Sequence, residues 1–373
     1  MLLGWASSRW KTKDQMSRIP PEPLRGRGAL SLPDNRFDRE IRELVSDDGL
    51  PPALDNATRL IPETARTIIT ENDSPDVGFS RSVNPYRGCE HGCIYCFARP
   101  SHATVGYSPG LDFERRILFK KDAPALLERE LSRKGYVVEP LALGINTDAY
   151  QPAEDALGLT RAILDVLDRF NHPVVLITKS SLIERDLDIL SSMAARHLVH
   201  VHLSLPTFDE ALSRHLEPRA TTPSRRIETL RRLSSAHVPT GVLVAPVIPG
   251  LTCHELESIL SGSREAGAAS AGYILLRLPL EVRGLFSEWL ERHYPDKAQA
   301  VLSRLREYHG GKLYDDRFGV RMRGEGMMAD LLSKRMEVAS RRLAFPGLPP
   351  LETRLFHPPH RPMSSRLFPN FIP

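Results

Sequence analysis

The sequence has few of the features that mark membrane, disulfide-rich or strongly charged proteins. No apolar run in its 373 residues approaches the roughly 20 residues that a membrane-spanning helix needs. Only four cysteines are present, which excludes a disulfide-stapled mini-protein. The net charge of +4 is too small to identify a nucleic-acid partner by charge. An aromatic share of 7% provides no extended platform for stacking single strands.

What is present is an ordinary globular composition, with 41% apolar and 26% charged residues. These values permit a sizeable core and exclude a wholly disordered chain. The apolar opening at residues 1–5 is too short for the core of a signal peptide. We therefore expect a cytoplasmic enzyme or binding protein without membrane association. The composition leaves the oligomeric state open.

Continuous apolar runs recur through the middle of the chain and predict strands buried on both faces. Segments with apolar residues at helical spacing separate them, and this alternation indicates a parallel sheet. The predicted strands span residues 79–83, 141–145, 174–178, 198–205, 241–247 and 273–278. The first helix is expected near residues 123–133. The sequence thus predicts about six βα units.

Six units are fewer than the eight of a full barrel, so periodicity alone leaves a partly open barrel and a doubly wound sheet as alternatives. In both folds the loops at the carboxyl ends of the strands meet on one face, where we expect the site. The chain divides into an irregular N-terminal extension with a short helix near residues 38–45, the α/β region, a helical C-terminal appendage and a Pro/Arg-rich tail. The expected ranges are 1–75, 76–285, 286–343 and 344–373.

Three of the four cysteines, Cys89, Cys93 and Cys96, follow the first predicted strand at spacing C-x3-C-x2-C. Cysteines this close in sequence are poorly placed to bridge one another, whereas thiolates on a short loop suit a metal or cluster. Three thiolates can hold three corners of a four-iron cluster and leave the fourth iron open. Ferredoxin-type electron carriers instead close all four corners with cysteine.

Two other sites use the same cysteines. One is a zinc site with His91 or His102 as the fourth ligand. The other is a purely structural iron-sulfur cluster, for which Cys253 is the remaining thiol. A zinc site would make the protein a non-catalytic binding module.

The loop resembles that of the radical S-adenosylmethionine (SAM) superfamily, whose signature is C-x3-C-x-aromatic-C. Cys89, Cys93, Tyr95 and Cys96 match every required position. The resemblance implies a partial (β/α)6 TIM-like barrel, a [4Fe-4S] cluster on the three cysteines, SAM bound at the open iron and Tyr95 near the adenine. It also implies that one electron, from a donor such as flavodoxin or ferredoxin, cleaves SAM to methionine and a 5′-deoxyadenosyl radical, which abstracts hydrogen from substrate.

More narrowly, segments at the ends of the predicted strands resemble the radical SAM proteins related to spore photoproduct lyase, known as DNA repair photolyases. The resemblance covers roughly residues 76–285, in the segments 147–152, 177–180, 202–206, 216–219 and 245–251. In that group the lysine after the third strand and a serine after the fourth contact SAM. The resemblance therefore assigns SAM contacts to Lys179 and Ser204.

Two features depart from these patterns. Asn146, Thr147 and Asp148 stand where the superfamily usually has Gly-Gly-Glu. We assign Thr147 and Asp148 to the SAM amino group or ribose, with a turn or helix N-cap as the alternative. The cysteine that returns hydrogen in spore photoproduct lyases is missing, because no cysteine lies between Cys96 and Cys253. The candidate substitutes are Tyr107, Tyr150 and Cys253.

The sequence leaves the substrate open. A nucleic acid such as DNA is one candidate, and a protein or small molecule is another, because the strand-end residues serve SAM and not the target. If DNA binds, the basic tail with Arg354, Arg361 and Arg366 is the expected contact segment. Glu217 and Arg219 are expected to form a salt bridge that lines the pocket or a plain surface pair.

Overall fold

The computed structural model describes residues 24–38 and 55–358. The short helix expected near residues 38–45 lies outside the described residues, apart from Asp38 itself, and so do Arg361 and Arg366 of the tail. Among the residues that are described, no helix combines the length and apolar composition needed to cross a membrane.

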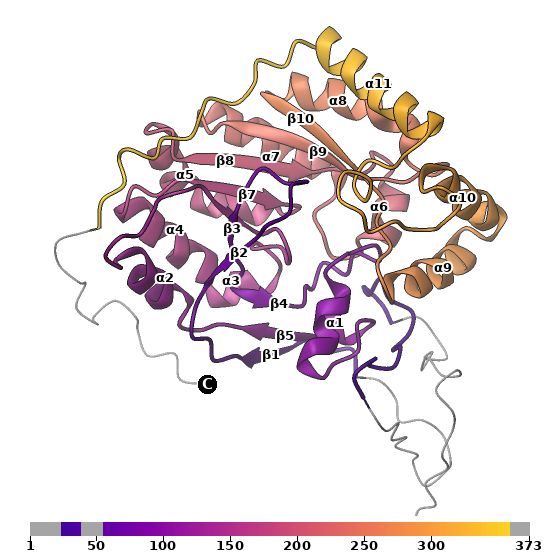
Figure 1. The fold of residues 1–373 in the computed structure, drawn as a ribbon, viewed down its shortest axis with the longest axis horizontal. Helices are drawn as coiled ribbons and strands as arrows, with labels where there is room; N and C mark the ends of the chain where they lie inside the picture. Colours follow the sequence, from indigo (N-terminus) through magenta and orange to yellow (C-terminus); the bar gives the residue numbers. More distant parts are fainter. Residues whose placement is uncertain (1–23, 39–54, 359–373) are drawn as a thin grey trace, which may run out of the picture.

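A seven-stranded sheet forms the centre of the fold (Figure 1). Six of its strands run parallel and lie side by side in the order of the sequence. They are β3 (Arg81–Val83), β6 (Leu141–Leu143), β7 (Val174–Thr178), β8 (Val199–Ser204), β9 (Thr240–Val247) and β10 (Ser270–Leu275). A short antiparallel strand, β2 (Ile69–Glu71), extends the sheet beyond β3. A doubly wound sheet reverses its strand order at a switch point, whereas this order runs on without reversal.

The two edges of the sheet are linked to each other, which requires the sheet to curl. The segment after the tenth helix runs along β10, with the amide of Leu275 donating to the carbonyl of Met322 at 2.8 Å. From that segment Arg321 reaches Asp76, in the loop between β2 and β3, at 2.5 Å. Seven strands laid flat would hold these edges about 29 Å apart. The fold is therefore a partial (β/α)6 barrel, as the resemblance of the cysteine loop implies.

The crossover helices pack against the outer face of this curled sheet. They are α2 (Ala123–Leu131), α4 (Leu159–Arg169), α5 (Leu187–Ala194), α7 (Pro223–Ser235) and α8 (Leu256–Glu265). Successive helices contact one another: α2 packs against α4, and α4 packs against α5. The side chains of β8 alternate accordingly: Val199 and Val201 are fully buried against the helices, whereas His200 and His202 are only partly buried on the other face.

Shorter elements surround the carboxyl ends of the strands. A second sheet of β1 (Arg59–Pro62), β5 (Arg116–Phe119) and β4 (Tyr86–Arg87) fixes the chain just before the cysteines. Single helical turns and short helices complete this end of the barrel. They are η1 (Arg99–Val105), α1 (Asp112–Arg115), α3 (Ala153–Leu157), η2 (Ser181–Asp186), α6 (Glu210–Leu216) and η3 (Cys253–Glu255).

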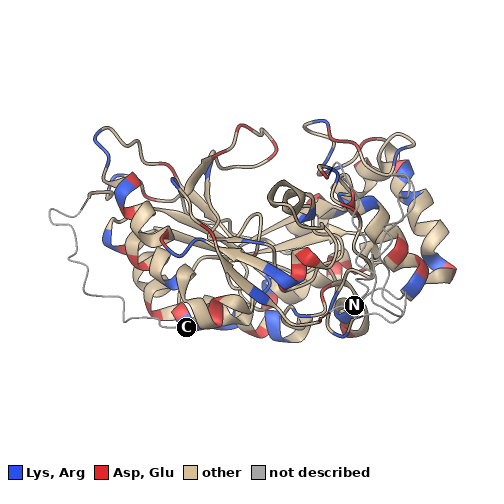
Figure 2. Ribbon diagram, turned by 90° about the horizontal axis from the view of Figure 1, so that it is seen from below, with Lys and Arg blue, Asp and Glu red and all other residues tan. Residues whose placement is uncertain are grey.

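Three helices follow the last strand of the barrel. α9 (Val282–His293) and α10 (Pro295–Tyr308) pack on each other, and Trp289 of α9 is fully buried. α11 (Met327–Arg342) packs on α8. Figure 2 shows Lys and Arg mixed with Asp and Glu along the outer helices, in keeping with the small net charge.

The described part of the C-terminal tail crosses the amino ends of the strands. The amide of Gly347 donates to the carbonyl of Ala269 at 2.8 Å, and the ring of His200 donates to the carbonyl of Pro349 at 2.8 Å. Both partners lie near strand starts. The amide of Glu352 donates to the carbonyl of His197, just before β8, at 2.9 Å, and Arg354 pairs with Glu352. Arg354 therefore lies near the amino ends of the strands, away from the cysteines, which follow the carboxyl end of β3.

One predicted strand is displaced. The sequence places the last strand at residues 273–278, whereas β10 begins three residues earlier, at Ser270, and ends at Leu275. Ser270, Ala271 and Gly272 carry little apolar surface, so hydropathy misses them. Their backbones nevertheless pair in register with Gly241 to Leu243 of β9.

Candidate functional site

Two glycines shape the loop that carries the cysteines. Gly88 and Gly92 have φ angles of +79° and +69°, a region that residues with a Cβ rarely adopt. A Cβ on Gly92 would also lie 2.8 Å from a carboxylate oxygen of Glu114. The loop is held in place by the amide of Cys89, which donates to the carbonyl of Phe113 at 2.8 Å, and by Ile94, which donates to Leu216. These bonds fix where the cysteine side chains begin.

A fully buried arginine supports the loop from within. The guanidinium of Arg99 donates to the carbonyls of Cys93 at 2.9 Å and Gly92 at 3.2 Å, and it pairs with Glu114 at 2.5 Å. Hydrogen bonds from a buried cation to backbone oxygens hold a loop more firmly than neutral bonds do. The full burial of Arg99 excludes a solvated surface position for this side chain.

The N-terminal segment closes over the same loop. The amides of Gly28 and Ala29 donate to the two oxygens of Glu114 at 2.9 and 2.8 Å. Arg27 donates to the backbone carbonyl of Glu114 at 2.7 Å. Glu114 itself is fully buried. The carboxylate therefore joins two chain segments about 86 residues apart beneath the cysteines.

The three cysteines of the loop carry thiols within a buried region. Cys89 and Cys93 are buried and Cys96 is partly buried. Burial raises the pKa of all three thiols, and for Cys89 the nearby Asp148, Cys93 and Cys96 raise it further. The three sulfurs thus lie close enough to influence one another's charge. No group of three or more His, Cys, Asp or Glu side chains in the described ranges is arranged around a single metal ion.

These thiols fit an iron-sulfur cluster in donor chemistry, because thiolates are its usual ligands. A cation also reaches the group: the charge of Lys179 lowers the pKa of Cys93 and Cys96 in part, against the larger effect of burial. In a bound state the thiols must be deprotonated, so cluster binding releases protons from them. The residues present therefore fit the group that the loop resemblance implies.

Three of the predicted SAM contacts lie together at the carboxyl ends of the strands. The ammonium of Lys179, just after β7, donates to the hydroxyl of Ser204, the last residue of β8, at 2.9 Å. It also lies 5.9 Å from the centre of the Tyr95 ring. Ser204 in turn donates to the carbonyl of Ala245 in β9 at 3.0 Å. The structure thus brings these three side chains to one place beside the thiols.

The other two predicted contacts already have partners within the protein. Thr147 donates its hydroxyl to the carbonyl of Tyr86 at 2.9 Å. Asp148 accepts from the hydroxyl of Thr178 and the amide of Lys179, both at 2.7 Å. Although burial opposes it, these contacts and His91 lower the pKa of Asp148 to about 2. Both residues fix the strand ends, which is the turn-type role that the sequence left as the alternative.

The three candidate hydrogen donors lie in different surroundings. Tyr107 packs its ring against His102 and Arg116. Tyr150 is fully buried and donates to Asp186 at 3.1 Å. Cys253 begins η3 beyond the end of β9, where its sulfur accepts from the amide of Gly250 at 3.4 Å. Within the described residues, none of these three side chains forms a hydrogen bond with Lys179 or Ser204.

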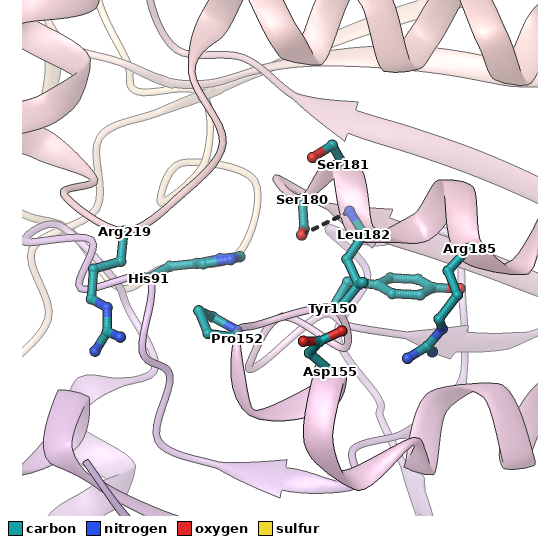
Figure 3. A pocket seen from close by; sticks show the side chains of 9 residues that line it. All are labelled: His91, Tyr150, Pro152, Asp155, Ser180, Ser181, Leu182, Arg185 and Arg219. Atoms are coloured by element: carbon teal, nitrogen blue, oxygen red, sulfur yellow. Dashed lines mark hydrogen bonds between the residues drawn. The ribbon is translucent and has the colours of Figure 1, made fainter. Parts of the chain in front are cut away.

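A cavity of about 420 Å³ opens beside the cysteine loop (Figure 3). His91, which stands between Cys89 and Cys93, forms one wall and lies on the side opposite Arg185. Ser180 and Ser181, which follow Lys179, line another part. The wall of this open cavity thus includes a residue two positions from both Cys89 and Cys93.

Near the thiols, the structure shows contacts of Glu217, Arg226 and Gln151 that the sequence did not predict. Glu217 pairs with Arg226 and not with Arg219, which instead pairs with Glu90 at 3.1 Å. Gln151 is fully buried and holds the loop by donating to the carbonyl of Gly88 and accepting from the amide of Glu90. Gln151 lies six positions after the predicted strand 141–145, within the segment 147–152 that carries the resemblance, and this position was its only signal.

Comparison with known proteins agrees with this geometry. The family model described as "Radical SAM superfamily" matches residues 83–261. An uncharacterized protein of Mycobacterium tuberculosis is 37% identical over 233 residues, which cover 62% of this chain and 67% of the relative. The chain belongs to the radical SAM superfamily. A second relative, an uncharacterized protein of Methanocaldococcus jannaschii, is 25% identical over 60% of this chain and 79% of its own length.

Solved structures show the same fold. Spore photoproduct lyase complexed with dinucleoside spore photoproduct superposes with a TM-score of 0.56 at 16% identity, over 77% of this chain and 80% of that one. A variant of that enzyme with bound AdoMet and the same dinucleoside gives a TM-score of 0.56 at 15% identity, over the same shares. At such identities the likeness establishes the architecture of this radical SAM protein and not its substrate.

Proposed function

We propose that this protein is a radical SAM enzyme of the photolyase-like group, which binds a [4Fe-4S] cluster through Cys89, Cys93 and Cys96 and uses SAM. The observation that carries the proposal is the convergence of three cysteine thiols, two buried and one partly buried, with Lys179 and Ser204 at the carboxyl ends of neighbouring strands. When bound, the cluster and SAM together supply a 5′-deoxyadenosyl radical that abstracts hydrogen from a substrate.

In this proposal some residues contact SAM and others hold the cysteine loop in place. Among the described residues, the ammonium of Lys179 donates a hydrogen bond to Ser204 alone, so it retains two N–H donors for the SAM carboxylate. Tyr95 offers the edge of its ring near the adenine. Arg99 and Gln151 keep the loop backbone in place. Burial of the thiols excludes water from the cluster, which strengthens the charge interactions around it.

For the substrate we propose a nucleic acid, with DNA as the first candidate, and for the electron donor a flavodoxin or ferredoxin. The support is the shared fold with an enzyme solved in complex with a dinucleoside. Arg354 lies at the opposite end of the barrel from the thiols, so this arginine is not the expected contact for the reacting nucleotide. A protein or small-molecule substrate is the alternative outcome.

The test is anaerobic reconstitution with iron and sulfide, followed by reduction in the presence of SAM. We expect about four irons per chain and the release of 5′-deoxyadenosine. One zinc per chain without sulfide would overturn the proposal in favour of a binding module. Adding damaged duplex and single-stranded DNA then tests the substrate, and gel shifts at two salt concentrations separate phosphate binding, which weakens steeply with salt, from no binding.

A further inference from the structure

A buried carboxylate lies at the centre of the proposed SAM contacts. Glu217, directly after α6, has a side chain with 0% exposure. One of its oxygens accepts from the hydroxyl of Tyr95 and the other from the guanidinium of Arg226, which is 1% exposed. The ammonium of Lys179 lies 3.9 Å from the oxygen that Tyr95 contacts. The carboxylate therefore has the cluster loop on one side and the strand-end lysine on the other.

Arg226 extends this group to the barrel itself. Its guanidinium donates to the carbonyl of Ser204 at 2.8 Å and to the carbonyl of Thr221 at 2.7 Å. Together with its bond to Glu217, these contacts tie α7 to the end of β8. Because Ser204 also holds Lys179, a single network runs from the loop aromatic through Glu217 and Arg226 back to the lysine.

The charges in this network balance in a way that keeps Glu217 ionised. Burial alone raises the pKa of Glu217, but the charges of Arg226 and Lys179 outweigh burial and hold its pKa below the usual range. The carboxylate therefore remains negative beside the lysine. The distance of 3.9 Å between Glu217 and Lys179 is too long for a hydrogen bond, so the lysine is attracted without being consumed as a donor.

A contribution to the stability of the fold does not by itself account for the buried network of Glu217, Arg226 and Tyr95. Replacing a buried ion pair with apolar side chains of similar volume is often neutral or stabilising, because two charges must be taken out of water. A network that is fully satisfied instead fixes the positions of its members. Here the members include the aromatic of the cysteine loop and both strand-end residues assigned to SAM. Its geometry thus serves the ligand site.

We propose that Glu217 is a positioning residue for SAM: its carboxylate fixes Tyr95 and Lys179 in the arrangement that receives the adenine and the carboxylate of the cofactor. This inference rests on the proposed function. Glu217 does not itself contact SAM in this assignment, and Arg226 anchors it to α7 and to Ser204.

The chain contains a comparable cluster that serves as a control. Glu154 is also fully buried, accepts from the hydroxyl of Tyr86 and pairs with Arg185 at 2.8 Å. It also accepts from the amide of Thr160 at 2.9 Å, which makes it part of the start of α4. Glu154 has no contact with Lys179 or Ser204. The two glutamates thus share burial and partner chemistry but differ in their neighbours.

The experiment compares Glu217→Gln with Glu154→Gln in cluster-loaded protein. SAM dissociation constants are measured by calorimetry, and the electron paramagnetic resonance spectrum of the reduced cluster is recorded with and without SAM. We expect Glu217→Gln to retain iron but to bind SAM about 10- to 100-fold more weakly. Its cluster spectrum should no longer change at SAM concentrations that shift the wild type. Glu154→Gln should keep wild-type affinity even where its thermal stability falls.

Tyr95→Phe provides a second variant that removes only the hydroxyl donated to Glu217, and it is used if Glu217→Gln does not fold or load iron. We expect it too to weaken SAM binding. Wild-type affinity in an iron-loaded Glu217→Gln protein, or in Tyr95→Phe when that variant is used, overturns the positioning role. Equal weakening in Glu154→Gln overturns it as well, because the effect would then be general. A cluster-loaded wild type that binds no SAM instead refutes the proposed function.

Discussion

Gly28 packs directly against Gly92, so that a Cβ on Gly28 would lie 1.8 Å from the carbonyl oxygen of Gly92. This contact joins the N-terminal segment to the turn between Cys89 and Cys93. No side chain larger than hydrogen fits there without moving one of the two backbones.

The first prediction follows from this contact. Gly28→Val should displace the loop around Gly92 and release Glu114 from the amides that it accepts. We expect the variant to lose iron and to bleach faster in air than the wild type, measured by the decay of its visible absorption. Gly78→Val is the control, because a Cβ there meets nothing within 4 Å. Equal bleaching of wild type and Gly28→Val would show that the N-terminal segment does not protect the cluster.

The second prediction concerns which thiols hold the cluster. Alanine at Cys89, Cys93 or Cys96 should abolish cluster binding, since each removes one of three iron ligands. Cys253→Ala should leave iron and sulfide content unchanged, because this sulfur accepts a hydrogen bond from Gly250 beyond β9. Iron and sulfide analysis of the four variants shows whether the cluster depends on the three loop cysteines alone or on Cys253 as well. Loss of the cluster in Cys253→Ala would make it a fourth ligand and close the site to SAM.

The third prediction separates cofactor binding from cluster binding. Lys179→Met keeps the length and apolar stem of the side chain but removes its charge. We expect normal iron content and SAM binding weakened by about 1.5–3 kcal/mol, the usual contribution of a hydrogen bond to a charged group. Thr147→Val is the comparison, because its hydroxyl is used by the carbonyl of Tyr86. If Thr147→Val weakens SAM binding more than Lys179→Met does, the assignment of Lys179 fails.

The fourth prediction concerns pH. Burial lowers the pKa of His172 to about 4, where its ring bonds to Tyr136 and to the carbonyl of Pro173. The unfolded chain binds this proton near pH 6.5, so the folded state loses stability as pH falls from about 6.5 towards 4, by about 1.4 kcal/mol per unit for this group. His172→Gln should show a shallower decline in urea unfolding over this range. An unchanged slope would show that His172 is not buried in its neutral form.

The fifth prediction tests the link between the two edges of the barrel. Asp76→Ala removes the partner of Arg321 and of the amide of Gly319, which donates to Asp76 at 2.6 Å. We expect faster hydrogen exchange in residues 72–80 and 315–325, while the exchange of β7 and β8 stays the same. Asp73→Ala, at an exposed neighbour, is the control. Unchanged exchange in Asp76→Ala would mean that other contacts hold the edges together.

The sequence predicts well those parts of the molecule that are encoded locally. Strands β7 and β9 lie within a residue of their predicted ends because their apolar runs are nearly continuous and are flanked by proline or polar residues within two positions. Lys179 and Ser204 were expected together because parallel strands place their carboxyl ends on one face. The spacing of the three cysteines identified the loop before its structure was known.

Contacts between distant segments could not be predicted in this way. Glu217 was matched with Arg219, two residues away, whereas its partner Arg226 comes from the next helix and meets it only after α6 and α7 fold back on each other. The link from Gly28 to Glu114 and the link from Asp76 to Arg321 likewise need the tertiary fold. Periodicity could not choose between the two α/β folds because curvature arises from such contacts.

The path of the C-terminal tail has a consequence for how the protein is made. Phe356 packs against Tyr136 and His172, and His357 donates to the carbonyl of Phe170, so the last described residues complete a core begun about 200 positions earlier. On the ribosome, those early residues emerge long before their partner exists. The first half of the barrel must therefore remain incompletely packed, and in need of protection from aggregation, until the segment around Phe356 has been synthesised.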